Sequence, residues 1–138
     1  EIRHAAGIAQ IGDFIDGLED GYHTRVAQGG NNFSGGQKQR LAIARALVKK
    51  PEIYIFDDSF SALDFKTDAR LRATLKEETT HSAVILVAQR ISTIMDADQI
   101  VVLDEGRVAG IGTHKELMES CTVYQQIARS QLSEEELA

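Results

Sequence analysis

The sequence predicts an α/β fold whose sheet is parallel at its centre. Two short apolar runs, Ile53–Phe56 and Ala83–Ala88, have the length and composition of buried strands, the first of them covered on both faces. The segment between them, from Asp64 to about Glu78, has helical character. Strands that alternate with helices are typical of an α/β sheet.

The first 50 residues are predicted to be mostly helical. Apolar residues recur every three or four positions over Glu1–Leu18, which is typical of an amphipathic helix. Gly21–Asn32 is rich in glycine and asparagine and indicates a loop. The next helix begins near Ser34, which can cap it, and ends near Lys49, because Pro51 stops it.

The last 40 residues predict a β-hairpin followed by helices. Gln99–Leu103 and Val108–Ile111 flank a turn signal, Asp104-Glu105-Gly106. Thr113 and Glu116 form a capping box for a helix that runs to about Met118. Another helix follows near Tyr124, and the acidic tail Ser133–Ala138 is expected to fray.

Composition excludes several classes of protein. The 138 residues are 43% apolar and carry a net charge of −6, which favours a folded domain and disfavours non-specific nucleic-acid binding. No apolar run has the length of a membrane span. A single cysteine, Cys121, precludes an internal disulfide, and we interpret it as a packing residue. The four histidines lack metal-ligand spacing, and His114 is interpreted as a surface residue.

Two motifs carry chemistry. In Phe33-Ser34-Gly35-Gly36-Gln37, adjacent glycines open a helix, so its free N–H groups and the Ser34 hydroxyl can hold a terminal phosphate. Asp57-Asp58 ends the first strand, where one carboxylate suits Mg²⁺ and the next can orient an attacking water. Taken alone, the first motif fits an ordinary serine-capped helix better, and the second fits an aspartate-rich turn equally well.

Together, however, these motifs closely resemble the ABC ATPase family. Phe33–Gln37 matches the signature motif of that family, usually Leu-Ser-Gly-Gly-Gln. Ile53–Asp58 matches its Walker B strand, and Ser61-Ala62-Leu63-Asp64 matches its D-loop. Val87–Thr93 takes the place of the family's switch loop, and the predicted hairpin and the Gly112–Leu117 segment match its closing elements.

This resemblance implies a partial P-loop NTPase (RecA-like) core with a mostly parallel sheet, a C-terminal β-hairpin and helices, plus part of the ABC helical subdomain. Residues 1–50 would belong to the helical subdomain, residues 51–132 to the C-terminal part of the ATPase core, and residues 133–138 to the tail. No Gly-x-x-x-x-Gly-Lys-Ser/Thr occurs, and the family's P-loop lies N-terminal to the signature. We therefore expect the chain to begin inside the helical subdomain, and these residues alone to bind ATP weakly and to be inactive.

The family resemblance also implies ligands and partners. ATP and Mg²⁺ would bind between two ATPase domains arranged head to tail. The signature, Phe33 to Gln37, would complete the partner's ATP site, whereas Asp57 (through water to Mg²⁺), Asp58 and Gln89 would serve this chain's own site. The D-loop, with Asp64, would lie at the dimer interface. The loop Val26–Asn31 looks like the exporter type, in which residues such as Gln28, Gly29 and Gly30 contact the coupling helices of a transmembrane domain.

Two residues depart from the family pattern. Asp58 stands where glutamate is usual, which withdraws the carboxylate by roughly 1 Å, a misplacement that can cost on the order of 100-fold in rate. Gln89 stands where histidine is usual, and glutamine cannot become a cation. The two changes together indicate a site that holds ATP more than it cleaves ATP. They resemble one subunit of a heterodimeric ABC exporter on the cytoplasmic face of the cell membrane.

Two alternatives to the slow-site subunit stay open at this point. The chain is also compatible with a fully active homodimeric exporter ATPase, or with a non-catalytic regulatory subunit that binds nucleotide. A soluble ABC ATPase of the DNA-repair or chromosome-structure kind is disfavoured, because the sequence lacks sustained heptads and has the exporter-like loop. These residues do not identify a cargo.

Overall fold

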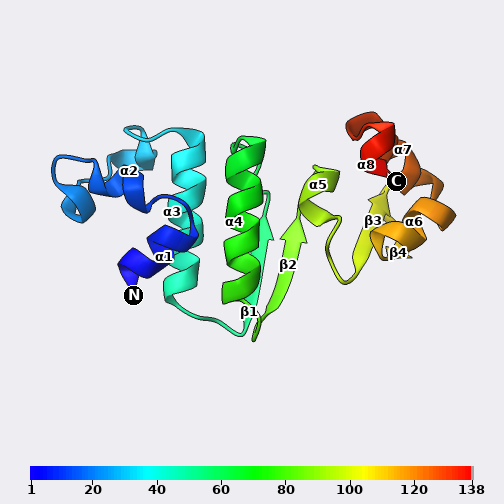
Figure 1. Cartoon of the computed structure of the whole chain (residues 1–138), viewed down its shortest axis with the longest axis horizontal. Coiled ribbons are helices and arrows are strands. Elements are labelled where there is room, and N and C mark those ends of the chain that lie inside the picture. The colour runs from blue at the N-terminus through cyan, green and yellow to red at the C-terminus, as the bar shows by residue number, and fades with distance from the viewer. Residues whose placement is uncertain (138) are drawn as a thin grey trace. The chain divides into compact units, whose positions relative to one another are not determined.

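The computed structural model describes residues 1–137 and divides into two compact units, Glu1–Val87 and the part from Ala88 onward (Figure 1). The first unit holds a helical region and a pair of parallel strands, and the second holds an antiparallel hairpin and helices. This composition confirms the predicted fold class. The predicted subdomain boundary at residue 50 stays a prediction, because it concerns the complete domain of the family.

The N-terminal region contains two short helices in place of the single predicted one. Helix α1 (Ile2–Ile8) and helix α2 (Gly12–Asp16) meet at Gln10, whose φ of 57° is left-handed and breaks the helical path. The Arg40 guanidinium donates to the Gln10 carbonyl at 2.6 Å and stabilises this break. Because the chain turns here, both Ala9 and Ile11 reach full burial, which one straight helix would not achieve.

The predicted loop after these helices contains two single 3₁₀ turns, Gly21–His23 and Gln28–Gly30. Helix α3 (Gly35–Val48) then begins at Ser34, as predicted from the serine cap. Its buried side chains Ile43 and Leu47 face the core of the unit. The loop and α3 therefore follow the predicted boundaries closely.

The parallel pair consists of β1 (Ile53–Asp57) and β2 (Ala83–Val87), connected by helix α4 (Phe65–Glu78). Their register runs from Ile53 opposite Ala83 to Asp57 opposite Val87. One face of the pair joins the core of the unit. It does so through side chains that are at most 4% exposed, from β1, α3 and α4: Tyr54, Phe56, Ile43, Leu47, Leu71 and Leu75.

The prediction that these strands are buried, β1 on both faces, is wrong for the described residues. Ile53 and Ile55 are 59% and 67% exposed, although their neighbour Tyr54 is 4% exposed. Val84, Ile85 and Val87 of β2 are also exposed. Successive side chains in a strand point to opposite faces, and the helices of this unit cover one face of β1. In β2 the adjacent Val84 and Ile85 are both exposed, so this strand is covered incompletely even on the helix side.

Helix α4 begins at an aspartate cap. The Asp64 carboxylate accepts from the Thr67 backbone N–H at 2.9 Å and from the Thr67 hydroxyl at 2.7 Å. These hydrogen bonds favour the charged carboxylate and lower the pKa of Asp64 below its ordinary value of 3.8. The cap fixes the start of α4 directly after the Ser61–Asp64 segment.

The second unit contains the predicted hairpin. Strands β3 (Ile100–Asp104) and β4 (Arg107–Gly112) pair antiparallel around Glu105 and Gly106, whose positive φ values of 46° and 74° are those of a type I′ turn. The capping box of Thr113 and Glu116 starts helix α6 (His114–Ser120) as predicted. Helix α7 (Thr122–Gln131) contains Tyr124.

Two elements of this unit differ from the sequence prediction. A single helical turn, α5 (Ile91–Ile94), follows β2 where only a loop was expected. Residues Glu134–Leu137 of the tail form a short helix, α8, and the Ser133 hydroxyl accepts from the Glu136 backbone N–H at 3.4 Å. That the tail frays stays a prediction. Ala138 lies outside the described residues.

The core of the second unit packs α6 and α7 against one face of the hairpin. Cys121 is 6% exposed there, which agrees with its interpretation as a packing residue. The surface interpretation of His114 is wrong: the ring is half-buried, and its Nδ1 lies 2.6 Å from the hydroxyl of the buried Tyr124. Burial raises the pKa of Tyr124.

Residues 1–137 contain no helix that combines the length and apolar character needed to cross a membrane. Nor does this part of the chain gather three or more histidine, cysteine or acidic side chains in the manner of a metal site.

Tyr124→Phe tests the contact between α6 and α7. Removing the hydroxyl deletes the hydrogen bond to His114, and we expect a loss of about 1 kcal/mol in the free energy of unfolding, measured by urea denaturation. Tyr22→Phe is the matched control, because the Tyr22 hydroxyl makes no recorded hydrogen bond within residues 1–137. Equal stability losses in the two variants would contradict the assignment.

Asp64→Asn tests the charged cap of α4. Since the pKa of Asp64 is lower in the folded than in the unfolded chain, its charge stabilises the fold above about pH 4. This contribution is lost as the pH falls through the lowered value. Asparagine also caps helices but does not titrate. We expect wild type to lose its stability advantage over Asp64→Asn on acidification, measured by unfolding midpoints from pH 7 to pH 2. An advantage independent of pH would contradict the role of the charge.

Candidate nucleotide site

The first part of the candidate site is the N-terminus of α3. The Ser34 hydroxyl accepts from the Gln37 backbone N–H at 3.2 Å, and the Gln37 side-chain oxygen accepts from the Ser34 backbone N–H at 2.8 Å. This reciprocal capping box fixes the first turn. The N–H groups of Gly35 and Gly36 belong to this turn, where no intrahelical acceptor is available. Such a terminus favours an anion.

The same turn lies against the Ser61–Asp64 segment of its own chain. A Cβ atom placed on Gly36 would come within 3.0 Å of the Ala62 carbonyl oxygen, and one on Gly35 within 3.4 Å of the Ala62 side chain. The close approach of two backbones therefore favours glycine at position 36, in addition to any contact with an anion. Sequence analysis assigned these glycines to an anion and missed this second contact.

The second part of the site is the carboxyl end of β1. Asp57 is the last residue of the strand, and Asp58 follows with a left-handed φ of 51°, its N–H donating to the Val87 carbonyl at 2.8 Å. Both carboxylates are exposed. Mg²⁺ prefers few protein carboxylates and several waters, so an exposed aspartate pair fits this ion. The carboxyl ends of parallel strands are also where α/β sheets bind ligands.

A side chain that sequence analysis missed connects these two parts. Gln39 Nε2 lies 3.1 Å from the Asp58 carbonyl and 3.0 Å from the Ser61 hydroxyl, and its Oε1 accepts from the Ala62 N–H at 2.9 Å. Gln39 follows Gly35 by four residues and Gly36 by three, which puts all three on one face of α3. That spacing was the available signal in the sequence.

The predicted D-loop residues have distinct environments. Leu63 is 4% exposed and belongs to the core, whereas Ser61, Ala62 and Asp64 are exposed. The Ser61 hydroxyl lies 3.3 Å from Asp58 Oδ2, and Asp64 binds Thr67 as described above. The segment therefore combines a buried anchor with a polar surface that touches the aspartate pair.

Gln89 belongs to the second unit, whereas the aspartate pair belongs to the first. Its side chain is exposed, and its backbone is held by Gln131 of α7. Gln131 Nε2 donates to the Gln89 carbonyl and Gln131 Oε1 accepts from the Ile91 N–H, each at 2.8 Å. Gln131 is a second residue that sequence analysis missed, because nothing in its local pattern distinguishes it.

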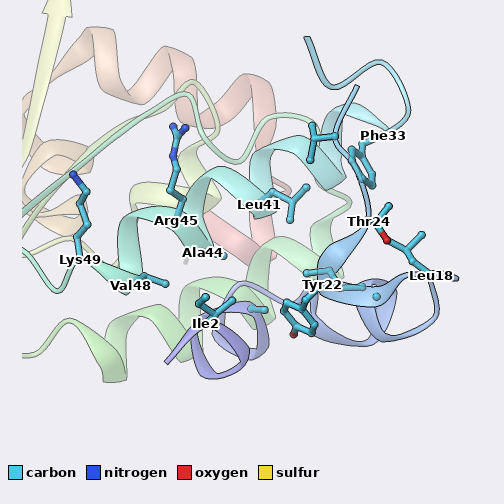
Figure 2. Close-up of a pocket in the computed structure, with 14 residues that line it drawn as sticks. Ile2, Leu18, Tyr22, Thr24, Phe33, Leu41, Ala44, Arg45, Val48 and Lys49 are labelled. Carbon is cyan, nitrogen blue, oxygen red and sulfur yellow. The ribbon is translucent and has the colours of Figure 1, made fainter. Parts of the chain in front are cut away.

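The proposed coupling residues come between Val26 and Phe33 in the sequence, and both of these residues line an apolar groove. Gln28 and Gly29 are exposed in their 3₁₀ turn, and Gly30 is buried. Figure 2 shows the groove, about 450 Å³ in volume, along α3, with Leu18, Tyr22, Thr24 and Phe33 toward one end and Ile2, Val48 and Lys49 toward the other. The Phe33 ring also packs edge-on against Phe14 at 5.9 Å. An apolar groove does not fit a phosphate, so it is separate in function from the glycine turn.

Comparison with known proteins agrees with this geometry. A family model described as ABC transporter matches residues 9–61. An uncharacterized ABC transporter ATP-binding protein of Mycobacterium tuberculosis is 50% identical, over 95% of this chain and 22% of that protein. The ATM1-type heavy metal exporter of Novosphingobium aromaticivorans is 44% identical, over 97% of this chain and 22% of that protein.

A solved structure is similar at the level of the fold as well. The structure of a bacterial Atm1-family ABC exporter with ATP bound superimposes with a TM-score of 0.91 and 44% identity, over 96% of this chain and 24% of that one. The chain spans about a fifth of the length of the curated relatives that it matches. The chain thus belongs to the ABC transporter ATP-binding family and forms a part of its nucleotide-binding domain.

Proposed function

We propose that this chain is part of the ATP-hydrolysing motor of an ABC membrane exporter, acting at the cytoplasmic face of the cell membrane. The observation that carries the proposal is the connection between the glycine turn of α3 and the aspartate pair at the end of β1. Similarity to an ATM1-type exporter and to an ATP-dependent lipid A-core flippase of Aliivibrio fischeri supports the direction of transport.

ATP and Mg²⁺ supply the transferable phosphoryl group and the charge that neutralises it. In this chain, Asp57 would hold Mg²⁺ through water, and Asp58 would orient the attacking water. Gln89 would donate a hydrogen bond to the terminal phosphate, since its amide can donate but cannot become cationic. Catalysis of this kind depends chiefly on positioning, which is why the groups that hold Asp58 and Gln89 matter.

The proposed partner is a second ABC ATPase domain bound head to tail. The turn from Phe33 to Gln37 would complete the partner's ATP site, and the D-loop would lie at the interface. Gln28, Gly29 and Gly30 would contact the coupling helices of a transmembrane domain. The exposure of Gln28 and Gly29, and the apolar groove lined by the nearby Val26 and Phe33, support that contact. These residues alone, without a P-loop among them, would be inactive.

We further propose that the chain's own ATP site is slow and that its partner differs from it. The shorter acid at Asp58 and the uncharged Gln89 favour a site that retains ATP, while the intact glycine turn favours hydrolysis in the partner's site. The same two residues favour a second candidate, a non-catalytic nucleotide-binding regulatory subunit. A fully active homodimer is the remaining alternative.

The double variant Asp58→Glu with Gln89→His, made in the full-length protein, tests the slow site. Glutamate extends the carboxylate by one methylene and histidine adds a potential cation, so we expect the ATPase rate of the chain to rise by about 10-fold or more. The assay is steady-state ATP hydrolysis, with the chain alone and with its partner. Wild-type turnover alone at roughly 1 s⁻¹ or faster would contradict the slow site and favour the homodimer.

Gly36→Ala tests the role of the glycine turn. The added methyl group would lie 3.0 Å from the Ala62 carbonyl and displace both the turn and the D-loop. We expect turnover of the assembled transporter to fall by about 100-fold. Gly7→Ala is the matched control, because a Cβ there meets no atom within 4 Å. Unchanged turnover in Gly36→Ala would remove the turn from the mechanism.

A further inference from the structure

We propose that Gln39 is a positioning residue that holds the glycine turn of α3 and the Asp58 segment in a fixed arrangement. The two ATP sites that these segments serve would then be coupled through this side chain. The inference rests on the proposed function, because it takes the turn to serve the partner's ATP and Asp58 to serve the chain's own. It concerns a residue that itself contacts neither nucleotide.

The polar atoms at both ends of the Gln39 carboxamide are hydrogen-bonded to the segment after β1. The half-buried Gln39 carboxamide is bonded at both ends: its nitrogen donates to the Asp58 carbonyl and the Ser61 hydroxyl, and its oxygen accepts from the Ala62 N–H. All three distances lie between 2.9 and 3.1 Å. One side chain of α3 therefore binds Asp58, Ser61 and Ala62 in the segment that follows β1.

Gln39 is also connected to the Asp58 carboxylate through the Ser61 hydroxyl. The Ser61 hydroxyl that Gln39 binds lies 3.3 Å from Asp58 Oδ2. Gln39 thus holds Asp58 at its backbone directly and at its carboxylate through Ser61. In the proposed assembly most hydrolysis occurs in the partner's ATP site, which the glycine turn completes. Because small misplacements in such a site are costly in rate, loss of Gln39 should lower turnover, through the turn and Asp58 together, more than it lowers ATP affinity.

The glycine turn of α3 also contacts the segment after β1 directly, at Ala62. Gly36 approaches the Ala62 carbonyl so closely that no Cβ fits without movement. Ala62 therefore makes two contacts with the same face of α3: its carbonyl lies against Gly36, and its N–H donates to Gln39. A movement of the turn on binding phosphate would then be transmitted to Asp58, and by reciprocity a movement at Asp58 to the turn.

The chemistry of position 39 requires an amide. Glutamate would keep the acceptor for the Ala62 N–H but lose the donor for Asp58 and Ser61, and lysine would do the reverse. Methionine would keep the length but lose all three hydrogen bonds. These three contacts can consequently be separated by substitution, which makes the proposal open to a sharp test.

The experiment uses the full-length protein with its partner in membrane vesicles, as wild type, Gln39→Met and Gln39→Glu. We expect kcat for ATP hydrolysis to fall by about 10-fold or more in both variants, with KM for ATP changed by less than about twofold. The cooperativity of turnover with ATP concentration should also fall. Hydrogen exchange of the Ala62 amide should accelerate in Gln39→Met only, since glutamate retains its acceptor.

Gln125→Met is the matched control. Gln125 also binds through its amide, donating to the Met118 carbonyl at 2.8 Å, but it is a half-buried residue of α7 in the second unit. We expect its turnover to equal wild type. In addition, Ser61→Ala combined with Gln39→Met should cost less than the sum of the two single changes, because both act through one contact path.

The ATPase measurements distinguish failure of the proposed function from failure of the role of Gln39. Absence of ATP hydrolysis in the wild-type assembly would overturn the proposed function, and the inference would fall with it. Normal wild-type hydrolysis with unchanged kcat and cooperativity in Gln39→Glu would overturn the inference alone. If Gln39→Met lowers the melting temperature and unfolds the domain, Gln39→Glu decides, since it preserves the Ala62 contact and the side-chain volume.

Discussion

The close approach of the first turn of α3 to the backbone at Ala62 is the constraint on which the first unit depends. A Cβ atom on Gly36 would lie 3.0 Å from the Ala62 carbonyl oxygen, so a side chain there would force one of the two backbones to move. With the turn placed there, the next turn of α3 directs Gln39 toward Asp58 and Ser61. Further along the same helix, Ile43 and Leu47 join the core that also contains Tyr54 and Phe56 of β1. One helix thereby sets the position of the sheet and of the acids at its end.

Features determined by neighbouring residues were predictable from the sequence. The caps at Ser34 and Thr113 and the tight turn at Glu105-Gly106 each depend on a few adjacent side chains, and each forms where the pattern indicated. The parallel pairing of β1 with β2 followed from the alternation of strands and helices. For the same reason the candidate residues at the end of β1 and the start of α3 were identified, since both motifs are continuous in sequence.

Features determined by distant residues were not predictable in this way. The open face of β1 and β2 depends on which helices cover the sheet, and apolar composition alone does not reveal that. The break at Gln10 depends on Arg40, thirty residues later. Gln131 escaped notice because a neutral amide leaves no charge pattern. The spacing of Gln39 from Gly35 and Gly36 places it on their face of α3, but its partners at Asp58 and Ser61 are distant in sequence. Each of the two amides holds the backbone of a candidate site residue. His114 likewise gains its role from Tyr124, ten residues away.

The contact between Gln131 and the loop around Gln89 has a consequence for the order in which the domain matures. The two residues are separated by 42 positions, and Gln131 occupies the last turn of α7. A growing chain emerges from the N-terminus onward, and its parts fold in that order. The loop therefore waits, after its own synthesis, for α6 and α7 to form before its backbone acquires an anchor. The formation of α6 and α7 is thus a late step in fixing the Gln89 loop. A polypeptide that ends before Gln131 would lack the hydrogen bonds that hold the backbone of this loop.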